Sequence, residues 1–144
     1  MEFKLKLSDV ALDETRQAIV KPLIEFNDAQ VGPSGYLPLV IEVQDEAGAT
    51  IGGLWGWTGY GWLFTQLLVV PEALRGQGVG RRLMTQAEDE ATARGCHGAW
   101  LDTFAFQARG FYESLGYRCF GELPEYPRGH VRYFMHKALA PRPA

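Results

Sequence analysis

The chain has 144 residues, of which 47% are hydrophobic, so it is long enough to bury one core and too short for two ordinary domains. Its formal net charge is −3, and acidic and basic residues are mixed along the sequence without a basic run. This balance argues against a nucleic acid as the main partner and favours a small metabolite.

Membrane and metal sites are not indicated either. No apolar stretch is long enough to span a bilayer, and the N-terminus alternates charged and apolar residues, unlike a signal peptide. We therefore expect a cytoplasmic protein without a membrane partner. The histidines are scattered, and Cys96 and Cys119 lack the paired spacing of metal ligands, so we infer no metal and two reduced, largely buried thiols.

The first elements in chain order are a strand and a helix. Apolar residues alternate with charged ones over residues 3–7, which is typical of a half-buried strand. Residues 13–27 show helical spacing with apolar side chains on one face, and Pro22 predicts a kink within that helix. Glycine, proline and serine over residues 32–35 then predict a loop.

Three strands are predicted next, over residues 36–44, 50–58 and 62–70, joined by short turns. They lead into a glycine-rich turn and then into the most clearly amphipathic helix, which begins at Val79 and ends before Gly95. The sequence therefore predicts an antiparallel meander that feeds a strand–loop–helix unit.

A short strand, a short helix and two strands complete the chain, over residues 99–101, 107–115, 117–123 and 131–138. There is no internal repeat and no interdomain linker. We therefore predict one domain of the α/β (α+β) class over residues 1–140, followed by a C-terminal tail over residues 141–144.

The turn Arg75-Gly76-Gln77-Gly78-Val79-Gly80 is the most informative motif. Backbone amides and the positive end of the helix dipole make such a turn an anion site. A dinucleotide-binding loop would need a third glycine where Arg81 stands, and a triphosphate-binding loop would need Gly-Lys before Ser or Thr, which is absent. The remaining pattern, met by Arg75, Gly78 and Gly80, resembles the pyrophosphate loop of the GNAT superfamily of N-acetyltransferases, which bind acetyl-CoA.

A second segment supports the same resemblance. Residues 108–117 are similar to the GNAT segment Ala, two residues, Phe-Tyr-Glu, two residues, Gly, aromatic, and they follow the first motif in the right order. The resemblance covers almost the whole chain, and residues 127–137 are similar to a bacterial subgroup whose substrates are mostly unassigned. It implies a central mixed, mostly antiparallel, twisted sheet flanked by helices, with a splayed strand pair at the CoA site. It also implies a homodimer, which is common among resembling proteins.

The resemblance further implies how acetyl-CoA binds. The backbone of the strand before the loop would pair with the pantetheine arm, and the loop and helix start would cradle the pyrophosphate. Many relatives carry an asparagine that binds pantetheine where this chain has Ala105, and Gln107 is a substitute amide. The expected cofactor-binding set is Leu68, Val69, Val70, Arg75, Gly76, Gln77, Gly78, Val79, Gly80, Arg81, Gln107 and Tyr112.

By the same resemblance Tyr112 is the expected catalytic residue, because its phenol can protonate the thiolate that leaves when an amine attacks the thioester. Relatives often place an acidic base on the strand before the loop, but this chain has Gln66 there, and glutamine cannot be a base. Asp102, Glu125 and His130 remain alternatives, and a neutral acceptor amine would need no base at all.

The acceptor pocket is less clearly marked. Aromatic residues are numerous, and Trp57 and Tyr126 are expected to wall the pocket, with Asp102 or Glu125 as counter-charge for a cationic amine. An aromatic amine and a polyamine both fit this description. The expected activity is acetyl transfer to a primary amine of a small molecule within a ternary complex. A peptide or protein lysine or N-terminus is the alternative acceptor, and a non-catalytic acyl-CoA binding protein is the alternative class.

Overall fold

The computed structural model describes residues 1–140. The described chain divides into two compact units, one up to Ser34 and one from Gly35 onward, and each is described by itself. The predicted tail over residues 141–144 lies outside the described residues.

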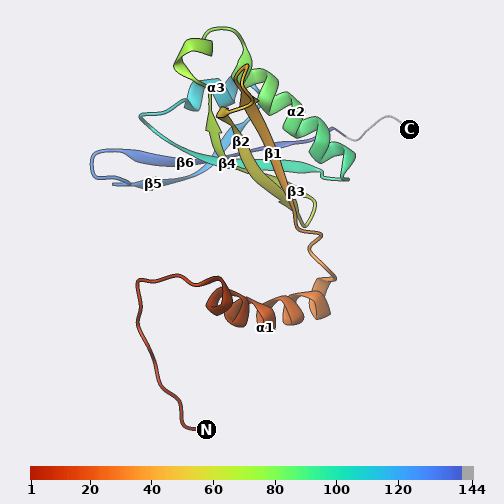
Figure 1. Cartoon of the computed structure of the whole chain (residues 1–144), viewed down its shortest axis with the longest axis vertical. Helices are drawn as coiled ribbons and strands as arrows, with labels where there is room; N and C mark the ends of the chain where they lie inside the picture. The colour runs from red at the N-terminus through yellow and green to blue at the C-terminus, as the bar shows by residue number, and fades with distance from the viewer. Residues whose placement is uncertain (141–144) are drawn as a thin grey trace. The chain divides into compact units, whose positions relative to one another are not determined.

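The N-terminal unit contains the helix α1 (Asp13–Val31), which runs past the predicted end at residue 27 and includes Pro22 in its interior (Figure 1). Its apolar side chains Ile19, Leu23 and Phe26 are 72%, 56% and 62% exposed. The strand predicted over residues 3–7 is absent from the described structure. Alternating apolar residues are not enough to form a strand, because the backbone also needs a neighbouring strand to pair with. In the described structure the strand pairs lie within residues 37–138.

The second unit is a six-stranded sheet in the order β1-β2-β3-β4-β6-β5. The pair β3–β4 is parallel and all other neighbours are antiparallel, which confirms the predicted mixed, mostly antiparallel sheet. Its strands are β1 (Leu37–Gln44), β2 (Thr50–Gly59), β3 (Trp62–Val69), β4 (Gly98–Phe104), β5 (Arg118–Pro124) and β6 (Val131–Ala138). A 3-10 turn, η1 (Glu72–Leu74), and the helices α2 (Val79–Ala93) and α3 (Arg109–Ser114) connect them.

The core lies between α2 and the sheet. The apolar stripe of α2 is buried against strands β1 to β3, as its helical spacing predicts. Each large buried side chain stabilises this packing by about 1.5–3 kcal/mol through removal of apolar surface from water. The fully or nearly fully buried members are Leu54, Leu63, Leu83, Met84, Ala87, Ala91, Leu101 and Met135.

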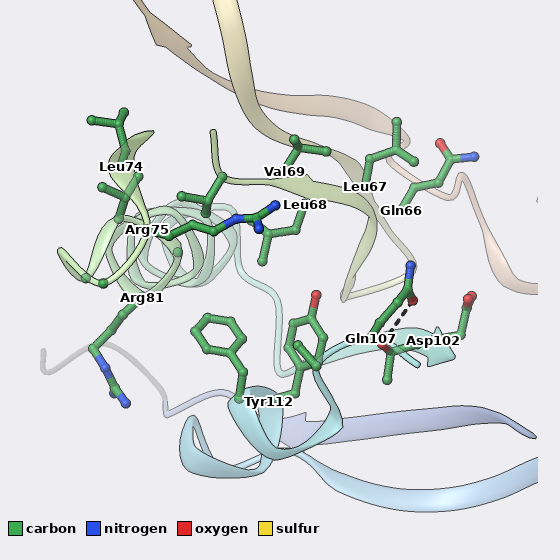
Figure 2. Close-up of a pocket in the computed structure, with 18 residues that line it drawn as sticks. Gln66, Leu67, Leu68, Val69, Leu74, Arg75, Arg81, Asp102, Gln107 and Tyr112 are labelled. Carbon is green, nitrogen blue, oxygen red and sulfur yellow. Dashed lines mark hydrogen bonds between the residues drawn. The ribbon is translucent and has the colours of Figure 1, made fainter. Parts of the chain in front are cut away.

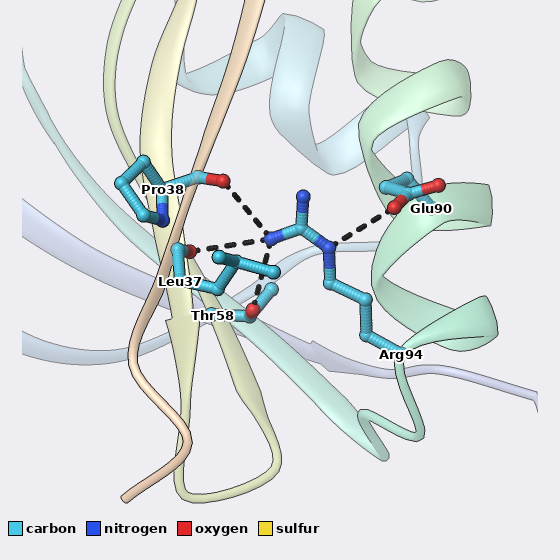
Figure 3. Close-up of polar contacts among 5 residues, drawn as sticks. All are labelled: Leu37, Pro38, Thr58, Glu90 and Arg94. Carbon is cyan, nitrogen blue, oxygen red and sulfur yellow. Dashed lines mark hydrogen bonds and ion pairs between the residues drawn. The ribbon is translucent and has the colours of Figure 1, made fainter.

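Arg94 joins the end of α2 to the start of β1 (Figure 3). Its Nη1 donates to the carbonyl oxygens of Leu37 and Pro38 at 3.2 and 3.1 Å and to Thr58 Oγ1 at 3.1 Å. Its Nε donates to Glu90 Oε1 at 3.0 Å, one turn back along the helix. One guanidinium therefore satisfies two backbone carbonyls and fixes α2 against the sheet.

The strands β3 and β4 separate halfway along their length. Their parallel pairing runs from Trp62 and Gly98 to Thr65 and Leu101 and then stops, while β4 continues to pair with β6. On its other side β3 has a bulge, because Leu67 and Thr65 face consecutive residues of β2 and leave Gln66 without a partner. The predicted splayed strand pair is thus confirmed, and it begins at Gln66.

The described chain holds no helix long and apolar enough to cross a membrane. Both cysteines are free thiols, Cys96 buried and Cys119 half-buried.

Candidate active site

A cavity of about 660 Å³ opens where β3 and β4 separate, and α2 begins at one end of it (Figure 2). The free edge of β3, the glycine loop, the end of β4 and the start of α3 form its walls. Its lining residues are Gln66, Leu67, Leu68, Val69, Val70, Leu74, Arg75, Gly76, Gly78, Val79, Gly80, Arg81, Asp102, Thr103, Gln107, Ala108, Phe111 and Tyr112.

The glycine loop presents backbone amides to this cavity. Gly78 precedes the first residue of α2 in the left-handed conformation, with φ 74°, and Gly76 has φ 76°. A side chain at either position would be strained, although a Cβ there would meet no atom within 4 Å. Because the first amides of a helix lack intrahelical acceptors, the loop and the α2 N-terminus form an anion site.

Gly80 has a different role, which is close packing. A Cβ at this position would lie 3.2 Å from the Phe111 ring and 3.5 Å from Val70 Cγ2. The glycine therefore lets the first turn of α2 approach α3 and the end of β3.

The cationic and polar side chains of the loop point in different directions. The Arg75 guanidinium extends over the cavity in Figure 2, toward Leu68. Arg81 Nη2 instead donates to Ser114 Oγ at 3.3 Å, at the end of α3. Gln77 is the one member of the expected cofactor set that does not line the cavity, because its Nε2 donates back to the Ala73 carbonyl at 3.4 Å.

Gln107 offers an amide to the cavity in a fixed orientation (Figure 2). Its Oε1 accepts from the Phe104 backbone N–H at 2.9 Å and from the Thr103 hydroxyl at 3.2 Å. Because the Phe104 N–H can only donate, the oxygen must face it, and the two hydrogens of Nε2 are left for the cavity. The side chain can thus donate where the resemblance expects an amide and the sequence has Ala105.

Tyr112 lies between the glycine loop and Asp102, and its hydroxyl points into the cavity in Figure 2. The ring packs against Phe111 and Tyr117 at centroid distances of 5.2 and 6.1 Å. Burial, and secondly the negative charge of Asp102, raise the pKa of the Tyr112 hydroxyl above its ordinary value of 10.0. The phenol is therefore held in its protonated form, which a general acid requires.

Asp102 lines the cavity but is already engaged. Its Oδ1 accepts from Arg132 Nε at 2.9 Å and forms an ion pair with Nη2 at 2.7 Å. The Asp102 side chain is 17% exposed and that of Arg132 is 25% exposed. Arg132 is a site neighbour that no sequence motif indicates, because the β4–β6 pairing that places it opposite Phe104 is not readable from local patterns.

Three of the expected acceptor residues do not line the cavity. Trp57 packs on Phe64 at 4.7 Å on the sheet, away from the cavity. Glu125 and Tyr126 lie where β5 leads into the turn before β6, and Glu125 Oε1 accepts from the Gly129 amide at 3.4 Å. Trp57 thus packs on its cross-strand partner in β3.

The cavity brings together the parts that were expected of an acyl-CoA site. The diverging strands leave backbone groups free for an extended amide-bearing chain, the glycine loop supplies amides for a pyrophosphate, and the cavity has the size of a ligand site. The described residues contain no cluster of three or more metal-ligating side chains. The fold and the site are those of an acetyltransferase.

The comparisons with known proteins agree. Residues 7–117 match the model of the Acetyltransferase (GNAT) family, and the chain belongs to that family. It is 42% identical over 131 residues to Acetyltransferase Atu2258 of Agrobacterium fabrum, covering 91% of this chain and 96% of the relative. It is 41% identical over 95 residues to Blasticidin-S acetyltransferase of Streptomyces morookaense, covering 65% and 70%.

A solved structure has the same fold. The crystal structure of a candidate acetyltransferase from Agrobacterium tumefaciens superposes with a TM-score of 0.89 at 40% identity, over 94% of this chain and 99% of that one. The GNAT family uses acetyl-CoA, and this chain is an acetyl-CoA-dependent acetyltransferase.

Proposed function

We propose that the protein transfers the acetyl group of acetyl-CoA to a primary amine of a small molecule, by direct attack within a ternary complex. The observation that carries this proposal is the position of the Tyr112 phenol, which faces the same cavity as the glycine loop and the free edge of β3. The name of the Streptomyces relative, Blasticidin-S acetyltransferase, supports a small-molecule acceptor. A pure acyl-CoA binding protein would have no use for an acid at that place.

In this proposal the residues divide the binding of acetyl-CoA among them. The backbone of residues 68–70 pairs with the pantetheine arm, and Gln107 Nε2 donates to one of its carbonyls. The amides of residues 76–81 and the Arg75 guanidinium bind the pyrophosphate. Tyr112 donates its proton to the departing sulfur.

No base is assigned, because no free carboxylate lines the cavity. Asp102 is the acidic residue there, and Arg132 engages its carboxylate, while Gln66 has no basic group. We propose that the acceptor enters as the neutral amine and that its proton leaves to water after the attack. Turnover should then rise with pH as the fraction of neutral amine grows.

Two measurements test the proposal. Calorimetry with acetyl-CoA measures binding, and release of free thiol with a panel of small amines and lysine peptides measures transfer. We expect binding together with turnover on small amines. Binding without turnover on any acceptor would favour the non-catalytic class, turnover on peptides alone would favour the peptide acceptor, and absence of binding would refute the CoA site.

We also propose a cytoplasmic homodimer, in which residues 1–140 act as one acetyltransferase domain. Free thiols at both cysteines support a reducing compartment. The dimer rests on the resemblance to the family, in which dimers are common. The family match over residues 7–117 covers parts of both units, which supports a single functional domain. Light scattering of the full chain measures the mass directly, and a monomer at micromolar concentration would exclude the dimer.

A further inference from the structure

Two stacked ring pairs share Phe104 at the end of β4. Phe104 stacks on Phe106 with a centroid distance of 5.2 Å and an interplanar angle of 11°, and on Tyr126 with 5.6 Å and 15°. We call Phe104, Phe106 and Tyr126 the ring ladder. Phe106 is 57% exposed and Tyr126 is 45% exposed, so both outer rings keep surface that another flat group can cover.

Backbone hydrogen bonds hold the ring ladder in place. The Ala105 N–H donates to the Val131 carbonyl at 2.8 Å, and the Tyr126 N–H donates to the His130 carbonyl at 3.0 Å. The His130 ring also packs edge-on against Phe106 at 5.2 Å. A platform fixed in this way loses little conformational freedom when a ligand stacks on it.

None of the three rings lines the cavity, but Phe106 directly precedes Gln107, which does. Asp102 lines the cavity and lies two residues before Phe104 on β4, so both side chains project from the same face of the sheet. Figure 2 shows Tyr112 between Arg75 and Asp102. A molecule on the ring ladder would therefore reach the Tyr112 hydroxyl from the side opposite to the pyrophosphate site.

One of the two carboxylates beside the ring ladder is paired with a cation. Arg132 neutralises Asp102, and its guanidinium carbon lies 5.2 Å from the Phe104 centroid and 4.9 Å from that of Tyr126. The Glu125 carboxylate accepts from the Gly129 amide within its own turn. Glu125 keeps its negative charge, since an amide hydrogen bond does not neutralise a carboxylate, so the selection of a planar group rests on the flat rings and the flat guanidinium beside them.

We propose that the ring ladder is the acceptor subsite, and that it selects primary amines that carry a planar aromatic or heteroaromatic group. This inference rests on the proposed function and names the class of its substrate. Polyamines, which have no ring to stack, are poor acceptors.

A matched pair of amines tests the selection. 2-Phenylethylamine and 2-cyclohexylethylamine share their chain and amine and differ in the flat ring. We expect the kcat/KM of the aromatic amine to be about two- to tenfold higher, as one aromatic stack provides. Phe106→Leu and Tyr126→Leu should remove this preference while leaving the KM of acetyl-CoA unchanged.

Phe120→Leu is the control, because Phe120 is 58% exposed, similar to Phe106, but lies on β5 and packs on Phe134 and His136 rather than on the ring ladder. It should keep the full preference. Equal kcat/KM for the two amines in the unaltered protein, or a preference that survives both ladder variants, would overturn the proposal while leaving the proposed function standing.

The two proposals can fail separately. If no small amine is acetylated although acetyl-CoA binds, the proposed function fails, and calorimetry of the two amines with the CoA-bound protein then decides the subsite. Tighter binding of the aromatic amine, lost in Phe106→Leu and kept in Phe120→Leu, would support the ring ladder as a binding site. Equal binding of the two amines would refute it.

Discussion

Replacing Gly78 with alanine tests whether the backbone at the α2 N-terminus binds the pyrophosphate of acetyl-CoA. Gly78 has φ 74°, and a Cβ there would meet no atom within 4 Å, so the substitution introduces backbone strain without a collision. The left-handed conformation costs a non-glycine residue about 1–2 kcal/mol. In the free protein the loop can relax and turn its amides away, so binding must restore the strained conformation.

The affinity for acetyl-CoA should then fall by the energy of that strain, which corresponds to about 5- to 30-fold in Kd. Calorimetry with acetyl-CoA and with S-acetylpantetheine, which lacks the pyrophosphate, separates the two parts of the site. Gly78→Ala should weaken the binding of acetyl-CoA but not that of S-acetylpantetheine, because only the pyrophosphate contacts the loop amides.

Gly48→Ala is the matched control for this experiment. Gly48 lies in the turn between β1 and β2 with φ 83°, and a Cβ there also meets nothing within 4 Å. Gly48→Ala should lower the free energy of unfolding by about 1–2 kcal/mol, the strain of a left-handed alanine. It should leave the affinities for acetyl-CoA and for S-acetylpantetheine unchanged. If Gly78→Ala loses stability but binds acetyl-CoA as tightly as the unaltered protein, the loop is not the pyrophosphate site.

Four further outcomes follow from the site and the core. Tyr112→Phe should lower kcat at least tenfold with little change in acetyl-CoA affinity or melting temperature, and unchanged kcat across several pH values would exclude the acid role. Because burial and Asp102 raise the Tyr112 pKa, kcat should fall with rising pH only above about 10, and Asp102→Asn should move that fall to lower pH, measured as a kcat profile. Gln107→Glu keeps the acceptor for the Phe104 N–H but has no amide hydrogens, so the KM of acetyl-CoA should rise about five- to tenfold without loss of stability, whereas an unchanged KM would remove Gln107 from the site. Arg94→Met should lower the free energy of unfolding in urea by about 1–3 kcal/mol through unpaired carbonyls while kcat stays unchanged, and full stability would show that water replaces the guanidinium.

The meander, the amphipathic helix and the glycine loop were predictable because each depends on a local pattern. The spacing of apolar residues and the turn residues predicted the strands β1 to β3 and the start of α2 at Val79. The structure contains these elements at those positions. The strand expected over residues 3–7 failed for a physical reason. A strand depends on a partner that alternation cannot supply, and the described structure has no pairing for those residues.

The acceptor end of the site depends on contacts between residues distant in sequence. Because β6 lies between β4 and β5, Arg132 is brought opposite Phe104 and binds Asp102. Sequence patterns indicated that Asp102 lies at the acceptor site but did not indicate its ion pair with Arg132. Asp102 therefore remained a candidate for the general base. The same patterns indicated Tyr126 and Trp57 equally as acceptor residues, and only the packing distinguishes them. The Tyr126 ring lies beside Arg132, whereas the Trp57 ring packs on Phe64 of the neighbouring strand.

The position of the cavity follows from one extra residue in β3. Gln66 is bulged relative to β2 and is also the first residue of β3 beyond its pairing with β4. A bulge increases the local twist and bends its strand, so β3 turns away from β4 where the parallel ladder ends. Opposite the bulge, a Cβ on Gly56 would lie 2.1 Å from the Phe64 carbonyl oxygen, so this close approach requires glycine. Gln66 has no basic group, so it cannot take up the proton of the acceptor amine.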